Sequence, residues 1–347
     1  MNEITLQYTR HIRRQAFLVS GIAVLLIIGL YLALLIGPVK LNILSSDLWS
    51  DTLARKIFLS VRLPRVLAAI LAGAALSVSG LAMQNVLRNP LASPFTLGIS
   101  GSAAFGAALS IVLMGSRGRF NHFISSRPWF ATLSTSFAAF SFALLSVTII
   151  LWIMKSRGGR PSIIILAGIM ISSMFGACTS ALQYFVNDRQ LAEIVFWTFG
   201  DPGRATYYML IVQSMIIIPV LFWTIRHSWD FALLQTGDES AKSGGLDPVR
   251  FRFLVLALVS LMTAIVVAGF GIIGYVGLVA PHICRSFIRG NSALIVASAL
   301  FGGLFLLFSD ALGRIILQPV ILPVGIVTAF FGAPFFIVML LQNKGLK

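Results

Sequence analysis

The sequence predicts an all-α integral membrane protein with about ten transmembrane helices, and two observations support this prediction. First, the 347 residues are 58% hydrophobic and only 11% charged, whereas soluble domains are roughly 25% charged. Second, the long apolar runs are continuous and lack the period-two alternation of barrel strands. Because lipid cannot satisfy backbone hydrogen bonds, such runs must form helices.

A helix needs about 20 apolar residues to cross the hydrocarbon core of a bilayer. On this basis the chain is a single transmembrane domain, residues 1–347, with ten spans and both termini in the cytoplasm. A cytoplasmic loop over residues 227–250 separates the sixth and seventh spans. The expected spans are residues 16–36, 63–83, 95–114, 130–154, 162–186, 205–225, 251–270, 275–289, 293–312 and 323–342.

Three of these spans have informative sequences. The first apolar run, Phe17–Ile36, exceeds the roughly 7 to 15 apolar residues of a signal peptide, so we expect a retained helix. The second run has Ala69, Gly73 and Ser77 at four-residue spacing, which allows close helix contact in lipid and predicts a buried helix. Three glycines and Pro281 weaken the eighth span, so we expect it to be short or broken.

The net charge of +15 does not indicate a nucleic-acid partner. The basic residues are scattered at the ends of apolar runs and form no stripe, so contact with membrane lipid explains them better. With the spans above, 15 of the 26 Lys and Arg residues are cytoplasmic and 11 are outside, which is a weak positive-inside bias. The basic outer face is a candidate surface for an acidic docking partner.

The sequence contains none of the common motifs of intrinsic catalysis. It has no GxxxxGK[ST] phosphate loop, no HExxH and no GxSxG. His282 belongs to no metal-spaced cluster of His and Cys residues, so we interpret it as structural rather than as a metal or haem ligand. Cys178 and Cys284 lie in apolar runs and are interpreted as small buried side chains. We therefore predict no catalytic residue, metal site or cofactor in this chain.

Four segments resemble the FecCD-type permease family, the transmembrane subunits of type II ABC importers for iron siderophores, haem or vitamin B12. They occur in the order found in that family and cover nearly the whole chain after the first helix. The segments are RLPRVLAAILAGAALSVSGLAMQNVLRNPLASPFTLGIS (62–100), GDESAKSGGL (237–246), GIIGYVGLVAPHICR (271–285) and LPVGIVTAFFGAPFFI (322–337).

The resemblance implies a bundle like that of the vitamin B12 importer permease, in the inner membrane of a prokaryote. It implies a homodimer that works with two copies of a separate ATPase, which carries ATP and Mg, and with a periplasmic or lipid-anchored substrate-binding protein. The cargo stays open among an iron siderophore, haem, cobalamin and an oxyanion such as molybdate. An ion-coupled secondary transporter is the alternative, although the eleven acidic residues cluster at span ends or in loops.

The resemblance assigns the polar loop over residues 237–246 to coupling with the ATPase, and an ordinary solvated connector is the alternative. In the family, this loop forms short helices that lie in a groove of the ATPase. The chain has Gly244 where the family usually has Leu, and two adjacent glycines each cost a helix about 1 kcal/mol. The second short helix is therefore expected to fray or to turn differently. The expected coupling residues are Gly237, Asp238, Glu239, Ala241, Lys242 and Gly245.

The resemblance also implies a cytoplasmic gate and an outer docking surface. In the family, the turn after the second span and the start of the fifth span line this gate at the dimer axis. A simple turn without a gating role is the alternative for the segment after the second span. Arginines at the outer ends of spans pair with glutamates of the binding protein, or alternatively reach lipid headgroups. The gate residues are Asn89, Pro90, Leu91, Pro161 and Ser162, and the docking residues are Arg62, Arg65 and Arg314.

The substrate path is expected along a small, polar and sulfur-bearing face of the fifth span. Core packing explains the methionine on this face equally well. Asp310 lies one turn before Arg314, so we expect these two side chains to pair. Residues 187–208 form an aromatic-rich outer segment near the mouth of the path. The candidate pathway residues are Ser172, Ser173, Met174, Ser180 and Gln183.

Overall fold

The computed structural model describes residues 3–37, 51–115, 128–156 and 158–342, and every regular element in these ranges is a helix. Three short elements accompany the α-helices: a π-turn at Phe58–Arg62 and 3₁₀ turns at Pro94–Leu97 and Pro202–Arg204. The prediction of an all-α protein is confirmed. The α-helices are α1 Glu3–Leu35, α3 Thr52–Ile57, α4 Leu63–Leu87, α5 Ile99–Gly115, α7 Pro128–Ser156, α8 Pro161–Phe185, α9 Asp188–Thr198, α10 Tyr207–Arg226, α11 Ser228–Gln235, α12 Asp238–Ser243, α13 Pro248–Phe270, α14 Val276–Phe287, α15 Asn291–Gly313 and α16 Val324–Gln342.

Seven helices of the described residues are long and apolar enough to cross a membrane. They are α1, the continuous helix from α3 through α4, and α7, α8, α10, α13 and α15. The shorter apolar helices α5 and α16 and the 12-residue α14 coincide with the other three expected spans. The structure therefore agrees with about ten spans, three of which are short.

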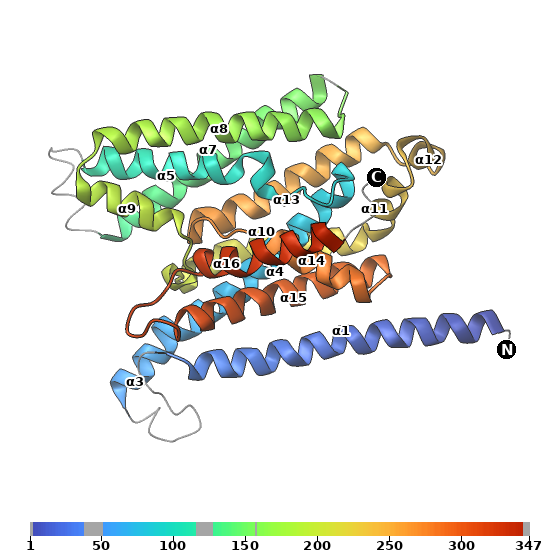
Figure 1. The fold of residues 1–347 in the computed structure, drawn as a ribbon, viewed down its shortest axis with the longest axis horizontal. Helices are drawn as coiled ribbons and strands as arrows, with labels where there is room; N and C mark the ends of the chain where they lie inside the picture. Colours follow the sequence, from blue (N-terminus) through green and yellow to red (C-terminus); the bar gives the residue numbers. More distant parts are fainter. Residues whose placement is uncertain (1–2, 38–50, 116–127, 157, 343–347) are drawn as a thin grey trace.

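The long helices run side by side, with α1 and α8 at opposite edges of the bundle (Figure 1). Helix α4 packs against α13, α14 and α15, while α5, α7 and α8 pack with one another and join the first group mainly through α13. The N-terminal end of α1, the pair α11–α12 and the C-terminal end of α16 lie at one end of the bundle. We call this the α12 end, and the opposite end, which holds α3 and α9, the α9 end.

Small residues let α4 approach its neighbours closely, as the four-residue spacing predicts. A Cβ atom on Gly73 would collide with the backbone of Gly302 on α15, and one on Gly80 would collide with the backbone of Gly277 on α14. Between them, the Ser77 hydroxyl donates a 2.7 Å hydrogen bond to the carbonyl of Ser298. The prediction that this helix is buried is confirmed.

The start of α14 is irregular, as its glycines and proline suggest. Residues 271–274 are not helical, Gly271 has φ +81°, and Tyr275 adopts a left-handed conformation with φ +66° immediately before the helix. A Cβ atom on Gly271 would collide with the carbonyl of Trp197, so this backbone passes directly against the end of α9. The expected short eighth span is confirmed.

One boundary differs clearly from the expected one. The second span begins at Thr52 rather than at residue 63, because α3 and the π-turn continue into α4 without a break. The arginines that suggested a span end therefore lie inside the helix. The segment 187–208 contains the helix α9, which the Asn187 side chain caps by accepting a hydrogen bond from the Gln190 amide.

Candidate functional site

The coupling loop forms two short helices at the α12 end. Gly237 separates helices α11 and α12, and its φ of +129° is accessible to glycine but strained for other residues. Helix α12 ends at Ser243, and Gly244 and Gly245 turn the chain away, the latter with φ +85°. A Cβ atom on Gly244 would lie 2.7 Å from Cδ2 of Leu233 on α11, so this position suits glycine. The glycine pair therefore ends α12 in a defined turn, and the expected fraying of this helix is not seen.

The short helix α12 has one buried and one exposed face. Ala241 is fully buried beneath it, whereas Glu239 and Lys242 are exposed. A small apolar residue thus seats the helix on the bundle, and Glu239 and Lys242 lie on its exposed side. This arrangement offers a polar surface to a partner.

Asp238 joins α12 to two long helices. Its carboxylate accepts hydrogen bonds of 3.0 Å and 2.6 Å from the Arg252 guanidinium of α13, and a further short one from Arg88 at the end of α4. The same guanidiniums also donate to backbone carbonyls, Arg252 to Val86 and Arg88 to Leu234. We call Asp238, Arg88 and Arg252 the Asp238 clamp.

The charges of the clamp are set by burial and pairing. Arg252 is only 2% exposed, and a buried charge is retained when it is paired and hydrogen-bonded. The hydrogen bond from Arg252 holds the pKa of Asp238 below its ordinary value, and Arg88 acts in the same direction. Asp238 is therefore an anion at neutral pH.

The predicted gate turn is connected to this clamp. Arg88 ends α4 in a left-handed conformation with φ +46°, and Asn89 follows it. The Asn89 amide donates to the carbonyl of Gln84, and its side-chain oxygen accepts a 2.9 Å hydrogen bond from the Leu91 amide. Leu91 is 42% exposed, and Pro90 is exposed as well. The turn is thus well ordered and displays an apolar side chain.

The other two gate candidates lie apart from this turn. Pro161 is the first residue of α8, and the exposed Ser162 follows it. Among the described residues, no hydrogen bond links them to Asn89 within one chain. Their role in a gate stays a prediction that concerns the assembled transporter.

The predicted docking arginines are buried at the α9 end. Arg62, Arg65 and Arg314 are 4%, 7% and 3% exposed. Arg65 donates a 2.9 Å hydrogen bond to Asp310 and pairs with Asp201 at 3.0 Å. These guanidiniums are therefore engaged within the chain rather than free at its surface.

The remaining contacts of this buried cluster hold α1. Arg314 pairs with Asp310 at 3.1 Å, as the one-turn spacing predicts, and donates to the carbonyls of Ala33 and Ile36. Arg62 donates to the carbonyls of Leu34 and Leu35. The unsatisfied carbonyls at the end of α1 are thus capped by arginines. Docking through these residues stays a prediction, and their observed contacts are structural.

The candidate pathway residues divide between two faces of α8. In the single chain, the side chains of Ser173, Met174 and Ser180 are exposed, whereas those of Ser172 and Gln183 are half-buried. Ser172 faces α5, where a Cβ atom on Gly101 would come within 3.0 Å of its hydroxyl oxygen. Only the first three therefore lie on an open face of the helix.

Sequence reasoning found Asp238 but not Arg88 or Arg252. Both arginines lie at ends of apolar runs, where basic residues usually anchor a span in the membrane. Their partner is remote in sequence, 150 residues away for Arg88. Among the described residues, no group of three or more His, Cys, Asp or Glu side chains could hold a metal ion.

These features define a class of protein: a helical membrane protein with a short helix pair held to one end of its bundle by the Asp238 clamp. The chain belongs to the FecCD transport family, whose model matches residues 25–342. It is 46% identical over 289 residues to a protein of Methanocaldococcus jannaschii named as an ABC transporter permease, covering 82% of this chain and 81% of that protein.

Two further relatives have names that state a cargo. The hemin transport system permease of Yersinia pestis is 36% identical, with 83% of this chain and 84% of that protein covered. The vitamin B12 import system permease of Vibrio vulnificus is 32% identical, with 95% of each chain covered. A solved structure described as an inward-facing metal-chelate type ABC transporter matches with a TM-score of 0.81 at 28% identity, covering 93% of this chain and 98% of that one.

Proposed function

We propose that this chain is the permease subunit of an ATP-driven, binding-protein-dependent importer in the inner membrane of a prokaryote. Its cargo would be an iron chelate, either a siderophore or haem, or cobalamin. The names of the relatives support this cargo class, since they describe hemin, iron chelatin and vitamin B12 transport. Two copies would act with two ATPase subunits, which bind ATP and Mg, and with a periplasmic or lipid-anchored binding protein.

The Asp238 clamp is the observation that carries the proposed mechanism. The exposed face of α12, with Glu239 and Lys242, would lie against the ATPase in the cytoplasm. A displacement of α12 would then pull on α13 through Arg252 and on the end of α4 through Arg88. Arg88 directly precedes Asn89, so the same displacement would reach the gate turn. ATP hydrolysis would thus move the gate through charge-assisted hydrogen bonds, which are stronger than neutral ones.

The open face of α8 would line the substrate path between the two copies. Ser173, Met174 and Ser180 supply a mixed polar and sulfur-bearing wall there. Such a wall makes only weak contacts with a large chelate, which suits passage better than tight binding does.

Uptake by the complete transporter tests this proposal. We would place the permease, its ATPase and its binding protein in proteoliposomes and measure ATP-dependent uptake of radiolabelled haem, ferric siderophore and cobalamin. We expect Asp238→Asn to lower uptake of the cognate cargo by roughly tenfold, the equivalent of one weakened charged hydrogen bond.

The matched control is Asp247→Asn, another exposed acidic residue at the same end. Its side chain caps α13 by accepting from the Val249 and Arg250 amides, and asparagine caps a helix equally well. Uptake by this variant should stay near that of the wild type. Cargo accumulation by the permease without any ATPase would contradict the proposal and indicate a secondary transporter.

A further inference from the structure

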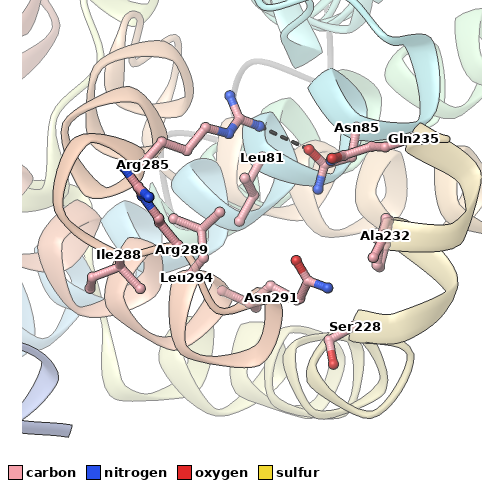
Figure 2. Close-up of a pocket in the computed structure, with 12 residues that line it drawn as sticks. Leu81, Asn85, Ser228, Ala232, Gln235, Arg285, Ile288, Arg289, Asn291 and Leu294 are labelled. Carbon is pink, nitrogen blue, oxygen red and sulfur yellow. Dashed lines mark hydrogen bonds between the residues drawn. The ribbon is translucent and has the colours of Figure 1, made fainter. Parts of the chain in front are cut away.

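A partly polar pocket of about 260 Å³ lies at the α12 end (Figure 2). No residue of the Asp238 clamp or of α8 lines it. It is formed by α4, α11, α14 and α15, and its polar lining includes Asn85, Gln235, Arg285, Arg289 and Asn291. One water needs only about 10–15 Å³ of such space. The pocket is therefore large enough for a ligand.

The pocket carries positive charge that its own lining does not neutralise. The Arg285 guanidinium donates to the side-chain oxygens of Gln84 and Asn85, at 2.6 Å and 2.9 Å, and both of these acceptors are uncharged. Arg289 is exposed beside it. None of the lining residues is acidic. The side-chain oxygens of Gln84 and Asn85 orient the Arg285 guanidinium, but no lining residue neutralises its charge.

The start of α15 adds to this positive potential. The helix begins at Asn291, which lines the pocket, and no side chain caps its N-terminus at Gly290. The first backbone N–H groups of a helix have no partner within the helix, and the dipole of a 23-residue helix favours an anion there. Two arginines and a helix N-terminus thus converge on one cavity, an arrangement that typically binds phosphate.

Most of the remaining lining is apolar. Leu81, Phe231, Leu294 and Ile295 form part of the wall, and Phe231 and Ile295 are almost fully buried. Such a wall lowers the local dielectric constant and strengthens the attraction of an anion. It also suits a ligand that joins a charged group to an apolar one.

We infer that this pocket binds a phosphate group, which either an anionic phospholipid headgroup or free phosphate could supply. The ligand accepts hydrogen bonds from Arg289 and from the first turn of α15, with Arg285 as the second cation. A ligand there joins α11 to the α14–α15 turn and so braces the first helix of the coupling loop.

Binding to the purified full chain in neutral detergent tests this inference. The probes are dihexanoyl-phosphatidylglycerol, dihexanoyl-phosphatidylcholine, sodium phosphate, and sodium chloride at matched ionic strength. We would follow the midpoint of thermal unfolding, which rises with a ligand that binds the folded state, and count bound molecules by native mass spectrometry. We expect phosphatidylglycerol or inorganic phosphate to give a saturable rise that phosphatidylcholine and chloride do not.

Arg289→Gln should weaken the apparent affinity for the active probe by roughly tenfold, because it removes one charge-assisted hydrogen bond. Arg289 is exposed, so this variant should fold as the wild type does. Arg160→Gln is the matched control, since Arg160 is an exposed arginine at the start of α8. The apparent affinity of this variant for the active probe should equal that of the wild type. Saturation by phosphatidylglycerol alone identifies the lipid as the source, and saturation by inorganic phosphate alone identifies the free ion.

An equal response of wild type and Arg289→Gln to every probe would overturn the inference. It would also be overturned if no probe bound and Arg289→Gln instead weakened assembly with the ATPase. That result would assign the pocket to an acidic side chain of the partner protein.

Discussion

The guanidinium of Arg65 on α4 donates a 2.9 Å hydrogen bond to the carboxylate of Asp310 on α15, and both residues are buried. Asp310 also pairs with Arg314, and Arg65 also pairs with Asp201. One carboxylate with almost no exposed surface therefore compensates two buried guanidiniums. This relationship makes Asp310 the centre of the charge balance at the α9 end.

Replacing Asp310 by asparagine should destabilise the chain by about 3–5 kcal/mol, because it leaves two buried arginines without their shared anion. The measurement is chemical unfolding in detergent. Asp201→Asn is the control, since that carboxylate is 32% exposed and Arg65 is its one ion-pair partner within the described residues. It should cost less than about 1 kcal/mol. Equal losses for the two variants would show that burial of the carboxylate does not decide its contribution.

The clamp should be insensitive to pH over the physiological range. The Arg252 hydrogen bond, followed by the charges of Arg252 and Arg88, lowers the pKa of Asp238 in the folded state. A lowered folded pKa contributes stability that is present above the unfolded pKa, about 3.9, and is lost as the pH falls through the folded pKa. We therefore expect α12 to stay docked from pH 7 to about pH 4 and to detach only at lower pH.

A fluorescent label on α12 measures this detachment. Ser243→Cys places the label on an exposed position at the end of the helix, with Cys178 and Cys284 replaced by serine. Fluorescence anisotropy should stay constant down to about pH 4 and then fall as α12 is released. In an Asp238→Asn background, the pH-dependent step should be absent. A step centred near neutral pH would contradict the assignment to Asp238.

The local features of the fold could be predicted from sequence, because their causes are local. Continuous apolar runs require helices in lipid, the glycines before residue 281 shorten α14, and the spacing of Asp310 and Arg314 brings them together. The small residues of α4 likewise indicated a close-packed helix. Each of these conclusions depends on residues within a few turns of one another.

The contacts that build the site could not be predicted, because they join distant segments. Arg65 and Asp310 are 245 residues apart, and Arg88 and Asp238 are 150 apart. An arginine at the end of an apolar run looks the same in sequence whether it reaches lipid headgroups or a carboxylate of another helix. For this reason the sequence did not reveal the intrachain partners of Arg62, Arg65 and Arg314.

Close contact between α4 and α14 makes Gly80 intolerant of any side chain. A Cβ atom there would collide with the backbone of Gly277, which cannot move aside as a flexible side chain could. We expect Gly80→Ala to destabilise the chain by about 2–3 kcal/mol, measured by chemical unfolding. Gly176→Ala on α8 is the control, since a Cβ atom there meets nothing within 4 Å. If both variants unfolded alike, the packing of α4 against α14 would not be as close as described.

Reversing the charge on the exposed face of α12 should uncouple the ATPase without unfolding the permease. Glu239 is exposed, so Glu239→Lys should leave the unfolding midpoint of the isolated chain unchanged. In the assembled complex, the variant should lose most of the substrate-stimulated ATP hydrolysis, because a like charge or an unpaired charge now faces the partner surface.

Glu193→Lys on α9 is the matched control, since the Glu193 side chain is 51% exposed at the other end of the bundle and forms a surface pair with Arg189. Such surface pairs contribute about 0–1 kcal/mol, so stimulation should persist in this variant. Normal stimulation in Glu239→Lys would remove α12 from the coupling surface and leave the Asp238 clamp with a purely structural role.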